Sequence, residues 1–166
     1  MLIMTGARKM EVLNSKWEDF DLSRCLWRIP TCKSGKPRHV PLSNGVLKLL
    51  AMVPLFEGCP YVFPNPKTKM PYASIYYSWD TARRQAGLSD VRMHDLRHSF
   101  ASFLVNSGRS LYEVQKLLGH TQVKTTQRYA HLKAETLFEA VNTVSQAIAP
   151  PAFIVPENSI VIDSGD

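Results

Sequence analysis

The amino-acid sequence predicts an α+β domain that is mostly α-helical, with one small antiparallel β-sheet near the N-terminus. Residues 25–29 and 38–42 alternate between apolar and polar side chains on either side of a glycine-containing turn, which is the pattern of a β-hairpin. The Pro-rich segment 54–71 is typical of a loop and holds a candidate third strand at residues 61–63. Apolar residues at helical spacing dominate the rest of the chain, as in residues 134–148.

Seven segments carry the apolar spacing and the end signals of helices. Ser43 or Asn44 can cap one helix at its N-terminus, and Ser110 can cap another. Gly87 and Gly119 follow the last apolar positions of two helices, where glycine commonly ends a helix. The expected helices cover residues 7–13, 44–53, 74–86, 95–105, 111–118, 121–131 and 134–148. A chain of 166 residues is long enough for one ordinary domain and too short for two.

The charge of the chain is unevenly distributed. The net charge is +6 and the pI is near 9.3, with 45% hydrophobic and 20% charged residues, a globular composition. Residues 1–133 hold all 20 Lys and Arg residues and nine of the 14 Asp and Glu residues, a net charge of +11. Residues 134–166 hold the other five acids, a net charge of −5. The basic part indicates a polyanionic partner, and the acidic end is either a cover for a basic surface or a solvated tail.

Several classes of protein are excluded by what the sequence lacks. No apolar run approaches the ~18 residues of a membrane span, and we expect no secretory signal at the start, which has no basic segment. Cys25, Cys32 and Cys59 form no C-x-x-C pair, which argues against a disulfide framework or a zinc knuckle and favours a reducing cytoplasm. No P-loop, G-x-G-x-x-G, H-E-x-x-H or G-x-S-x-G motif supports nucleotide-driven, zinc-protease or α/β-hydrolase chemistry.

The sequence HDLRH at residues 94–98 is the densest group of chemically useful side chains. His94 and Arg97 share a helical face, because they are three residues apart. His94 and His98 have the i,i+4 spacing of metal ligands, but the fixed charge of Arg97 would repel a dication and no carboxylate or thiolate follows at ligand spacing. An arginine fork and an imidazole fit a phosphodiester better, although such a pair alone is more often structural surface.

The segment from residue 117 to Tyr129 supports two interpretations. Leu-Leu-Gly-His ends one helix at His120, and Tyr129 lies nine residues further on in a polar helix. The Tyr129 hydroxyl can attack phosphorus if nearby cations lower the cost of the phenolate, and the alternative is that its ring is half-buried packing. The same segment also has the pattern of a helix-turn-helix DNA reader, with exposed DNA contacts at Lys124, Gln127 and Arg128.

Two weaker signals lie in the N-terminal third of the chain. Thr-Gly-Ala-Arg ends at Arg8, and Glu11 follows one turn later, where it is either an orienting partner for Arg8 or a surface carboxylate. Lys33 lies in the expected hairpin turn. A single arginine and a single turn lysine are each more often solvated surface than functional.

Together and in this order, the pieces resemble the catalytic domain of the tyrosine recombinases, the phage integrase family. The pieces are TGAR with Glu11 at residues 5–11, CKSGKPRHVPL at 32–42, HDLRHSFAS at 94–102, LLGH at 117–120 and TTQRYAH at 125–131. Each piece is weak alone, and five in sequence are highly specific. The resemblance runs from about Thr5 to Leu132 and implies the integrase catalytic-domain fold.

The resemblance implies catalytic roles for six residues: Arg8, Lys33, His94, Arg97, His120 and Tyr129. The two arginines would clamp the non-bridging oxygens of the scissile phosphate, and His120 would hydrogen-bond the same group. His94 would assist proton transfer to or from the nucleophile. Tyr129 would form a 3′-phosphotyrosyl bond, while Lys33, with Lys36 as the second choice, would protonate the leaving 5′ oxygen.

The resemblance also implies an activity, partners and a domain organisation. It implies a site-specific DNA recombinase that needs no metal, ATP or other cofactor and acts on double-stranded DNA as a homotetramer, monomeric or weakly associated off DNA, in a prokaryotic or phage setting without a membrane. We expect residues 1–149 to be the catalytic domain and residues 150–166 a tail that protomers exchange. The N-terminal DNA-clamping domain of such proteins is expected to be missing. Two alternatives stay open, a non-catalytic DNA-binding fragment and a nicking-closing activity like that of a type IB topoisomerase.

Overall fold

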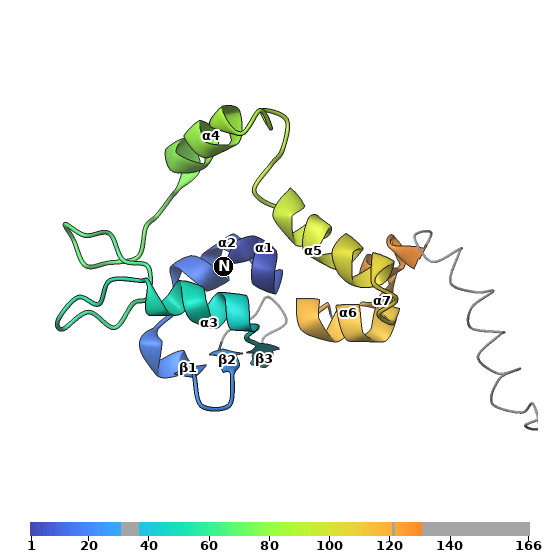
Figure 1. Ribbon diagram of the computed structural model, residues 1–166, viewed down its shortest axis with the longest axis horizontal. Helices are drawn as coiled ribbons and strands as arrows, with labels where there is room; N and C mark the ends of the chain where they lie inside the picture. Colours follow the sequence, from blue (N-terminus) through green and yellow to red (C-terminus); the bar gives the residue numbers. More distant parts are fainter. Residues whose placement is uncertain (31–36, 121, 131–166) are drawn as a thin grey trace, which may run out of the picture. The chain divides into compact units, whose positions relative to one another are not determined.

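The computed structural model describes residues 1–30, 37–120 and 122–130, all within one compact unit, Met1–Lys133. This unit is mostly helical and has one small antiparallel sheet near the N-terminus, which confirms the predicted fold class (Figure 1). The helix expected over residues 134–148, the tail after it and the domain boundary between them lie outside the described residues. No helix in the described part of the chain is long and apolar enough to cross a membrane.

The sheet contains three antiparallel strands in sequential order, β1 (Phe20–Asp21), β2 (Leu26–Ile29) and β3 (Arg38–Pro41). Trp27 pairs with Val40, and Ile29 pairs with Arg38, so β2 and β3 form the predicted hairpin. Because side chains alternate along a strand, Trp27, Ile29 and Val40 all reach the core and are 1–2% exposed.

The third strand is β1, and the prediction of a strand at residues 61–63 is wrong. Tyr61 makes only an isolated bridge to Lys16 in the described structure. Pro60 and Pro64 bound this segment, and proline has no N–H to donate to a strand ladder. Phe20 pairs with Trp27 instead, across a short turn.

The N-terminal segment forms two short helices, α1 (Leu2–Thr5) and α2 (Lys9–Leu13), rather than the single helix expected over residues 7–13. The chain turns between them at Gly6, whose φ is +62°. A Cβ at Gly6 would lie 2.4 Å from Cδ1 of Phe100, so only glycine allows this close approach to a later helix. The second helix begins at a capping box, in which the Arg8 backbone N–H donates to Glu11 Oε2 at 2.7 Å.

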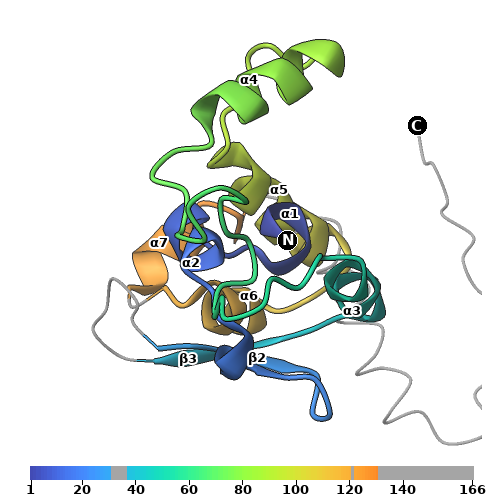
Figure 2. The ribbon, with the colours of Figure 1, turned by 90° about the vertical axis from the view of Figure 1, so that its left-hand side faces the viewer.

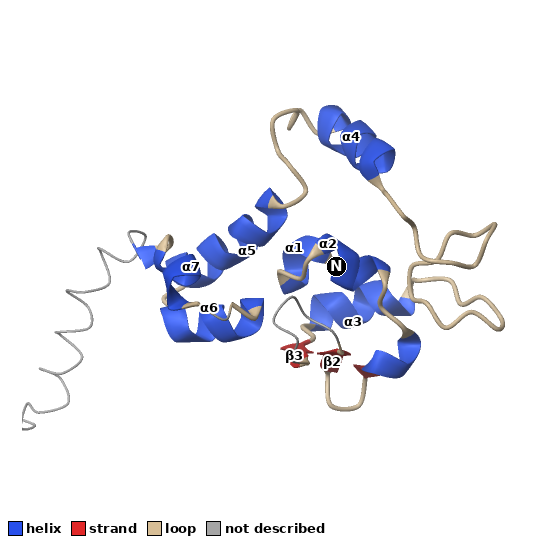
Figure 3. Cartoon of the chain, turned by 180° about the vertical axis from the view of Figure 1, so that it is seen from behind, coloured by secondary structure: helices blue, strands red, loops and turns tan. Residues whose placement is uncertain are grey.

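Three further elements precede α5 (Asp95–Asn106) in the chain: η1 (Trp17–Asp19), α3 (Asn44–Ala51) and α4 (Tyr76–Gln85). Ser43 caps α3, as one of the two predicted caps, and Val46 and Leu50 of that helix are buried against the sheet. Figure 2 shows the helices on one face of β2 and β3. Helix α4 lies apart from the other helices and has no buried residue (Figure 3). The buried residues around the sheet form a first core cluster. It consists of Ala7, Val12, Phe20, Trp27, Ile29, Val40, Leu42, Val46, Leu50 and Val62.

A second core cluster is formed by α5, α6 (Leu111–Leu118) and Tyr129, a residue beyond the end of α7 (Val123–Gln127). The predicted caps of α6 are confirmed, since Ser110 forms a capping box with Glu113 and Gly119 ends the helix with a φ of +63°. Tyr129 follows α7 rather than lying inside a helix, because its N–H donates to Thr126 O in a turn. The buried residues of this cluster are Ala101, Val105, Val114, Leu118 and Tyr129.

Candidate active site

Five of the six predicted site residues line one pocket of about 460 Å³. The sixth, Lys33, and its alternative, Lys36, lie outside the described residues. The lining residues come from the start of α2, from α5 and from the segment between α6 and the turn after α7, so four separate motifs meet at one place. These residues are Arg8, His94, Arg97, His98, Gly119, His120, Gln122, Thr125, Arg128 and Tyr129.

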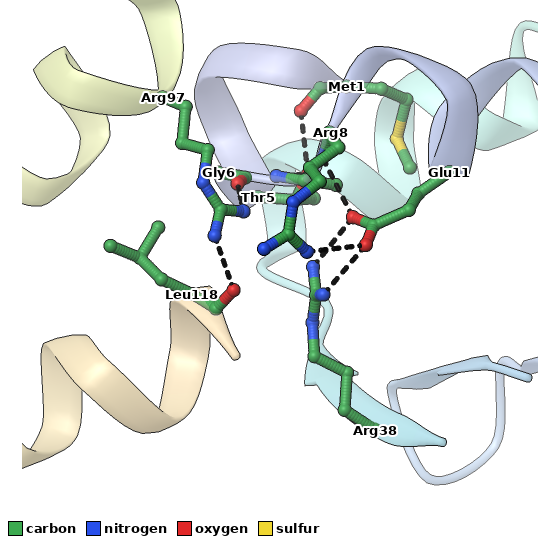
Figure 4. A network of polar contacts seen from close by, with 9 residues as sticks. Met1, Thr5, Gly6, Arg8, Glu11, Arg38, Arg97 and Leu118 are labelled. Carbon is green, nitrogen blue, oxygen red and sulfur yellow. Dashed lines mark hydrogen bonds and ion pairs between the residues drawn. The ribbon is translucent and has the colours of Figure 1, made fainter. Parts of the chain in front are cut away.

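Arg97 holds the two sides of the pocket together from its position in the first turns of α5. Its Nη1 donates to the Gly6 carbonyl and its Nη2 donates to the Leu118 carbonyl at 2.5 Å (Figure 4). The side chain is buried, which lowers the pKa of Arg97 to about 10, aided by the charges of Arg8 and Arg38. It therefore stays cationic at neutral pH. Since a guanidinium has five N–H donors and the carbonyls take two, donors are left for an anionic ligand.

Glu11 orients Arg8 and also binds a second arginine, Arg38. The Arg8 Nη1 donates to Glu11 Oε1 at 2.9 Å, and both terminal nitrogens of Arg38 donate to the same carboxylate at 2.8 Å. In Figure 4 the Arg8 guanidinium lies between those of Arg97 and Arg38. Burial acts to raise the pKa of Glu11, but the hydrogen bonds from Arg38 and Arg8 outweigh it and the pKa lies below its usual value.

Arg38 is a residue that sequence reasoning did not assign. It lies in an alternating segment, 38–42, whose pattern predicts only a strand. Its partner Glu11 is 27 residues earlier in the chain, so no local spacing connects the two. Gly119 makes room for it, because a Cβ there would lie 2.6 Å from Arg38 Cδ. The glycine of Leu-Gly-His thus serves both to end α6 and to admit the Arg38 side chain.

His120 is fixed at the pocket wall by contacts from two sides. Its backbone N–H donates to Gln115 O, and its carbonyl accepts from Gln115 Nε2 at 3.1 Å. Its Nδ1 lies 3.0 Å from the hydroxyl of Thr126, which is 1% exposed and which sequence reasoning did not assign. Burial, together with the charges of Arg97 and Arg8, lowers the pKa of His120 to about 4. The imidazole is therefore neutral at pH 7.

Tyr129 combines the two features that the sequence left as alternatives. Its ring is packed in the second core cluster and the residue is 5% exposed. Its hydroxyl reaches the pocket, where it lies 2.6 Å from Nδ1 of His98. Burial raises the pKa of Tyr129, whereas the charges of Arg128 and Arg97 act to lower it and are outweighed. The cations near this hydroxyl thus offset only part of the cost of forming a phenolate.

His94 and His98 lie one turn apart and contact each other through their rings. The ring centroids are 4.9 Å apart and the planes are nearly perpendicular, at 88°. Partial burial and the charge of Arg97 lower the pKa of His94. The described residues contain no group of three or more His, Cys, Asp or Glu side chains able to hold a metal ion.

The pocket is positively charged and shaped by fixed groups. The lining residues in the described ranges include three arginines and no carboxylate, and the imidazoles beside them have lowered pKa values. Arg128, a residue of the helix-turn-helix alternative, lines the same pocket, while Lys124 and Gln127 are exposed on α7. Such a site can hold a phosphodiester with arginine forks and place a tyrosine hydroxyl beside it.

Fold and site therefore define the class, a mainly helical domain with a cationic pocket that is able to hold a phosphodiester beside a tyrosine. Comparison with known families gives the particular family. Residues 1–136 match the Phage integrase family, and the chain belongs to that family.

Curated relatives of the chain come from bacteria and archaea. The chain is 32% identical over 145 residues to the tyrosine recombinase XerC of Staphylococcus carnosus, and this match covers 82% of the chain and 49% of the relative. It is 31% identical over 147 residues to XerA of Pyrococcus furiosus, covering 85% of the chain and 51% of the relative. The chain thus spans about half the length of the curated relatives it matches.

Solved structures show the same fold. The crystal structure of XerA recombinase aligns with a TM-score of 0.69 at 27% identity, covering 90% of this chain and 55% of that one. The catalytic domain of bacteriophage HP1 integrase aligns with a TM-score of 0.66 at 25% identity, covering 89% of this chain and 80% of that one. The XerH recombinase bound to a palindromic difH substrate, in a post-cleavage complex, aligns at 0.66 with 26% identity, covering 87% of this chain and 44% of that one.

Proposed function

We propose that this chain is the catalytic domain of a site-specific DNA recombinase, which cleaves and rejoins DNA strands through a 3′-phosphotyrosyl bond. The observation that carries the proposal is the meeting of the Tyr129 hydroxyl with Arg8 and Arg97 in one pocket. Membership of the phage integrase family supports it. A related recombinase, XerH, has been solved in a post-cleavage complex with its DNA substrate.

The arginines supply the main electrostatic stabilisation. Arg8 and Arg97 hold the non-bridging phosphate oxygens, on which charge accumulates as phosphorus becomes five-coordinate. Glu11 and Arg38 keep the Arg8 fork in place, so little reorganisation accompanies the reaction. With the Thr126 hydroxyl donating to Nδ1, His120 carries its hydrogen on Nε2 and donates it to the same phosphate.

The remaining groups move protons. His94 assists removal of the proton from the nucleophile, and Lys33 delivers a proton to the leaving 5′ oxygen, with Lys36 as the second choice. The phosphotyrosyl bond retains the energy of the broken phosphodiester, so the free 5′ hydroxyl can reverse the attack without ATP or a metal ion.

The partner is double-stranded DNA, and recombination requires a homotetramer assembled on it. We assign residues 1–149 to the catalytic domain and residues 150–166 to a tail exchanged between protomers. The net charge of −5 after residue 133 and the apolar stripe at residues 134–148 fit docking on a basic neighbouring copy. The proposed setting is the cytoplasm and nucleoid of a prokaryotic cell, or a phage, and the relatives named above come from a bacterium and an archaeon.

Covalent trapping tests the proposal directly. The 166-residue chain is mixed with a nicked, partly randomised duplex pool and denatured in SDS, and a slowly migrating protein–DNA adduct is expected. Tyr129→Phe removes only the hydroxyl and should give no adduct while still binding DNA. Binding without any adduct from the wild-type chain, even after an upstream DNA-clamping domain is joined to it, would instead favour a DNA-binding fragment that uses the exposed face of α7. Relaxation of supercoiled DNA without recombinant product would favour a topoisomerase-like outcome.

A further inference from the structure

We propose that His98, rather than His94, directly accepts the proton of the Tyr129 hydroxyl when that hydroxyl attacks phosphorus; the inference rests on the function proposed above. The observation that carries it is the 2.6 Å separation between Tyr129 Oη and His98 Nδ1. A proton acceptor must lie within hydrogen-bond distance of the proton it removes, and this separation meets that requirement before DNA is bound.

The packing of α5 against the end of α7 produces this contact. Tyr129 is 5% exposed and its ring packs in the second core cluster, so its hydroxyl is held in place beside His98. His98 is half-buried, and its ring centroid lies 6.1 Å from that of Tyr129. His94 contacts His98 edge to face, with 4.9 Å between the centroids. The order in space is therefore His94, His98 and Tyr129, with His98 next to the reacting oxygen.

The charges around His98 favour its neutral form. On its own helix it faces His94 and Asp95, the loop before α5 contributes Arg92, and the turn after α7 contributes Arg128. Burial, followed by His94 and Arg128, lowers the pKa of His98, and the opposing effect of Asp95 is smaller. Asp95 itself is paired with Arg92 at 2.9 Å. The neutral ring can accept the Tyr129 proton on Nδ1 when it carries its own hydrogen on Nε2, and the proposed step uses that tautomer.

The proposed step balances in protons and electrons. An electron pair of Tyr129 Oη forms the bond to phosphorus while the hydroxyl proton passes to His98 Nδ1. The bond from phosphorus to the 5′ oxygen breaks, and that oxygen takes its electron pair and a proton from the lysine assigned above. On rejoining, the 5′ hydroxyl attacks phosphorus and returns its proton to that lysine, and His98 returns its proton to the departing Tyr129 oxygen.

The test isolates the attacking side of the reaction. A duplex recovered from the trapping experiment is remade with sulfur in place of the scissile 5′ bridging oxygen, because a thiolate leaves without protonation. The rate of adduct formation by the full 166-residue chain is then measured from pH 5 to pH 9. The variant is His98→Asn, whose amide can hydrogen-bond Tyr129 but cannot take its proton. His39→Asn, at an exposed position on β3, is the matched control.

We expect the wild-type rate to rise as His98 loses its proton and then to level off. His98→Asn should be slower by about 100-fold or more at pH 7 and should lose that rise, and added imidazole should restore part of the rate. A His98→Asn rate within threefold of the wild type would overturn the inference. So would a slow variant with an unchanged pH profile and no imidazole rescue, since that result describes a residue that only positions Tyr129.

Two measurements keep a folding defect and a failure of the proposed function separate. Far-ultraviolet circular dichroism and DNA affinity of His98→Asn should match the wild type, and His98→Gln provides a second variant if they do not. Absence of an adduct from the wild-type chain, even after an upstream DNA-clamping domain is joined to it, contradicts the proposed function itself. An adduct from the wild type with unaffected His98 variants contradicts only the role of His98.

Discussion

The two sides of the pocket are built from different kinds of interaction. On the arginine side, Arg8 and Arg38 share the Glu11 carboxylate, and Arg97 donates to two backbone carbonyls. On the opposite side, His98 and Tyr129 contact each other through one hydrogen bond, and His120 contacts Thr126 through another. The first side carries permanent charge, whereas the three rings of the second are neutral at pH 7, with Arg128 as the permanent charge beside them.

Burial acts on both sides, with different consequences for function. It lowers the pKa of Arg97 to about 10, which leaves a cation, and it lowers the pKa of His120 to about 4, which leaves a neutral ring. A phosphate clamp needs charge that does not vary, whereas proton transfer needs groups that can change state. The same physical effect therefore separates the two tasks, because arginine starts so far above neutral pH.

The largest effect is expected from Arg97→Ala, which removes a phosphate ligand and a structural donor together. Loss of the clamp should slow adduct formation by on the order of 3 kcal/mol or more in activation free energy. The Gly6 and Leu118 carbonyls lose their donor, at about 2 kcal/mol each in unfolding free energy. Trapping kinetics and urea unfolding measure the two losses.

The control for Arg97→Ala is Arg24→Ala, whose side chain is 79% exposed beside β1. Arg24→Ala should change neither the rate of adduct formation nor the unfolding free energy measurably. Adduct formation by Arg97→Ala at the wild-type rate would contradict the clamp assignment. An unfolding free energy of Arg97→Ala equal to that of the wild type would contradict the structural role of Arg97.

The next effect concerns the carboxylate of the arginine side. Glu11→Gln leaves the Arg8 and Arg38 charges adjacent without their shared anion and should lower the unfolding free energy by about 3 kcal/mol. Because the folded pKa of Glu11 lies below its unfolded value of 4.5, its contribution is present above pH 4.5 and is lost as the pH falls through the folded pKa. Asp90→Asn, at an exposed position in the loop between α4 and α5, is the control. Equal acid sensitivity of Glu11→Gln and the wild type would argue against this role.

Much of this arrangement could be predicted from the sequence, and most of the misses, apart from the strand at residues 61–63, share one cause. The caps at Ser110 and Gly119 act within one turn, so local spacing reveals them. The break at Gly6 depends on Phe100, far along the chain. The same holds for the contacts of Arg38 with Glu11 and of His98 with Tyr129, which arise only when separate elements pack. The sequence pattern indicated which side chains gather at the site, whereas the tertiary contacts decide which of them touch.

On the imidazole side, a smaller effect should appear as a pH dependence of stability. The folded pKa of His120 is about 4, below its usual value of 6.5, so between these values the unfolded chain binds more protons than the folded one. The melting temperature should therefore fall as the pH drops from 6.5 toward 4. His120→Asn should remove part of this fall, since His94 and His98 shift in the same direction, and His39→Asn should leave it unchanged.

The smallest effect tests whether the neutral side depends on single hydrogen bonds. Thr126→Val keeps the shape of a side chain that is 1% exposed but removes the hydroxyl 3.0 Å from His120 Nδ1. One lost hydrogen bond should lower the unfolding free energy by about 1 kcal/mol and the melting temperature by roughly 2–4 °C. Thr81→Val, on the exposed face of α4, is the matched control. Adduct formation should slow as well, because nothing then fixes which nitrogen of His120 donates to the phosphate. A Thr126→Val protein with reduced stability and an unchanged adduct rate would show that the His120 ring needs no such partner, and the contrast between the two sides would then be one of charge alone.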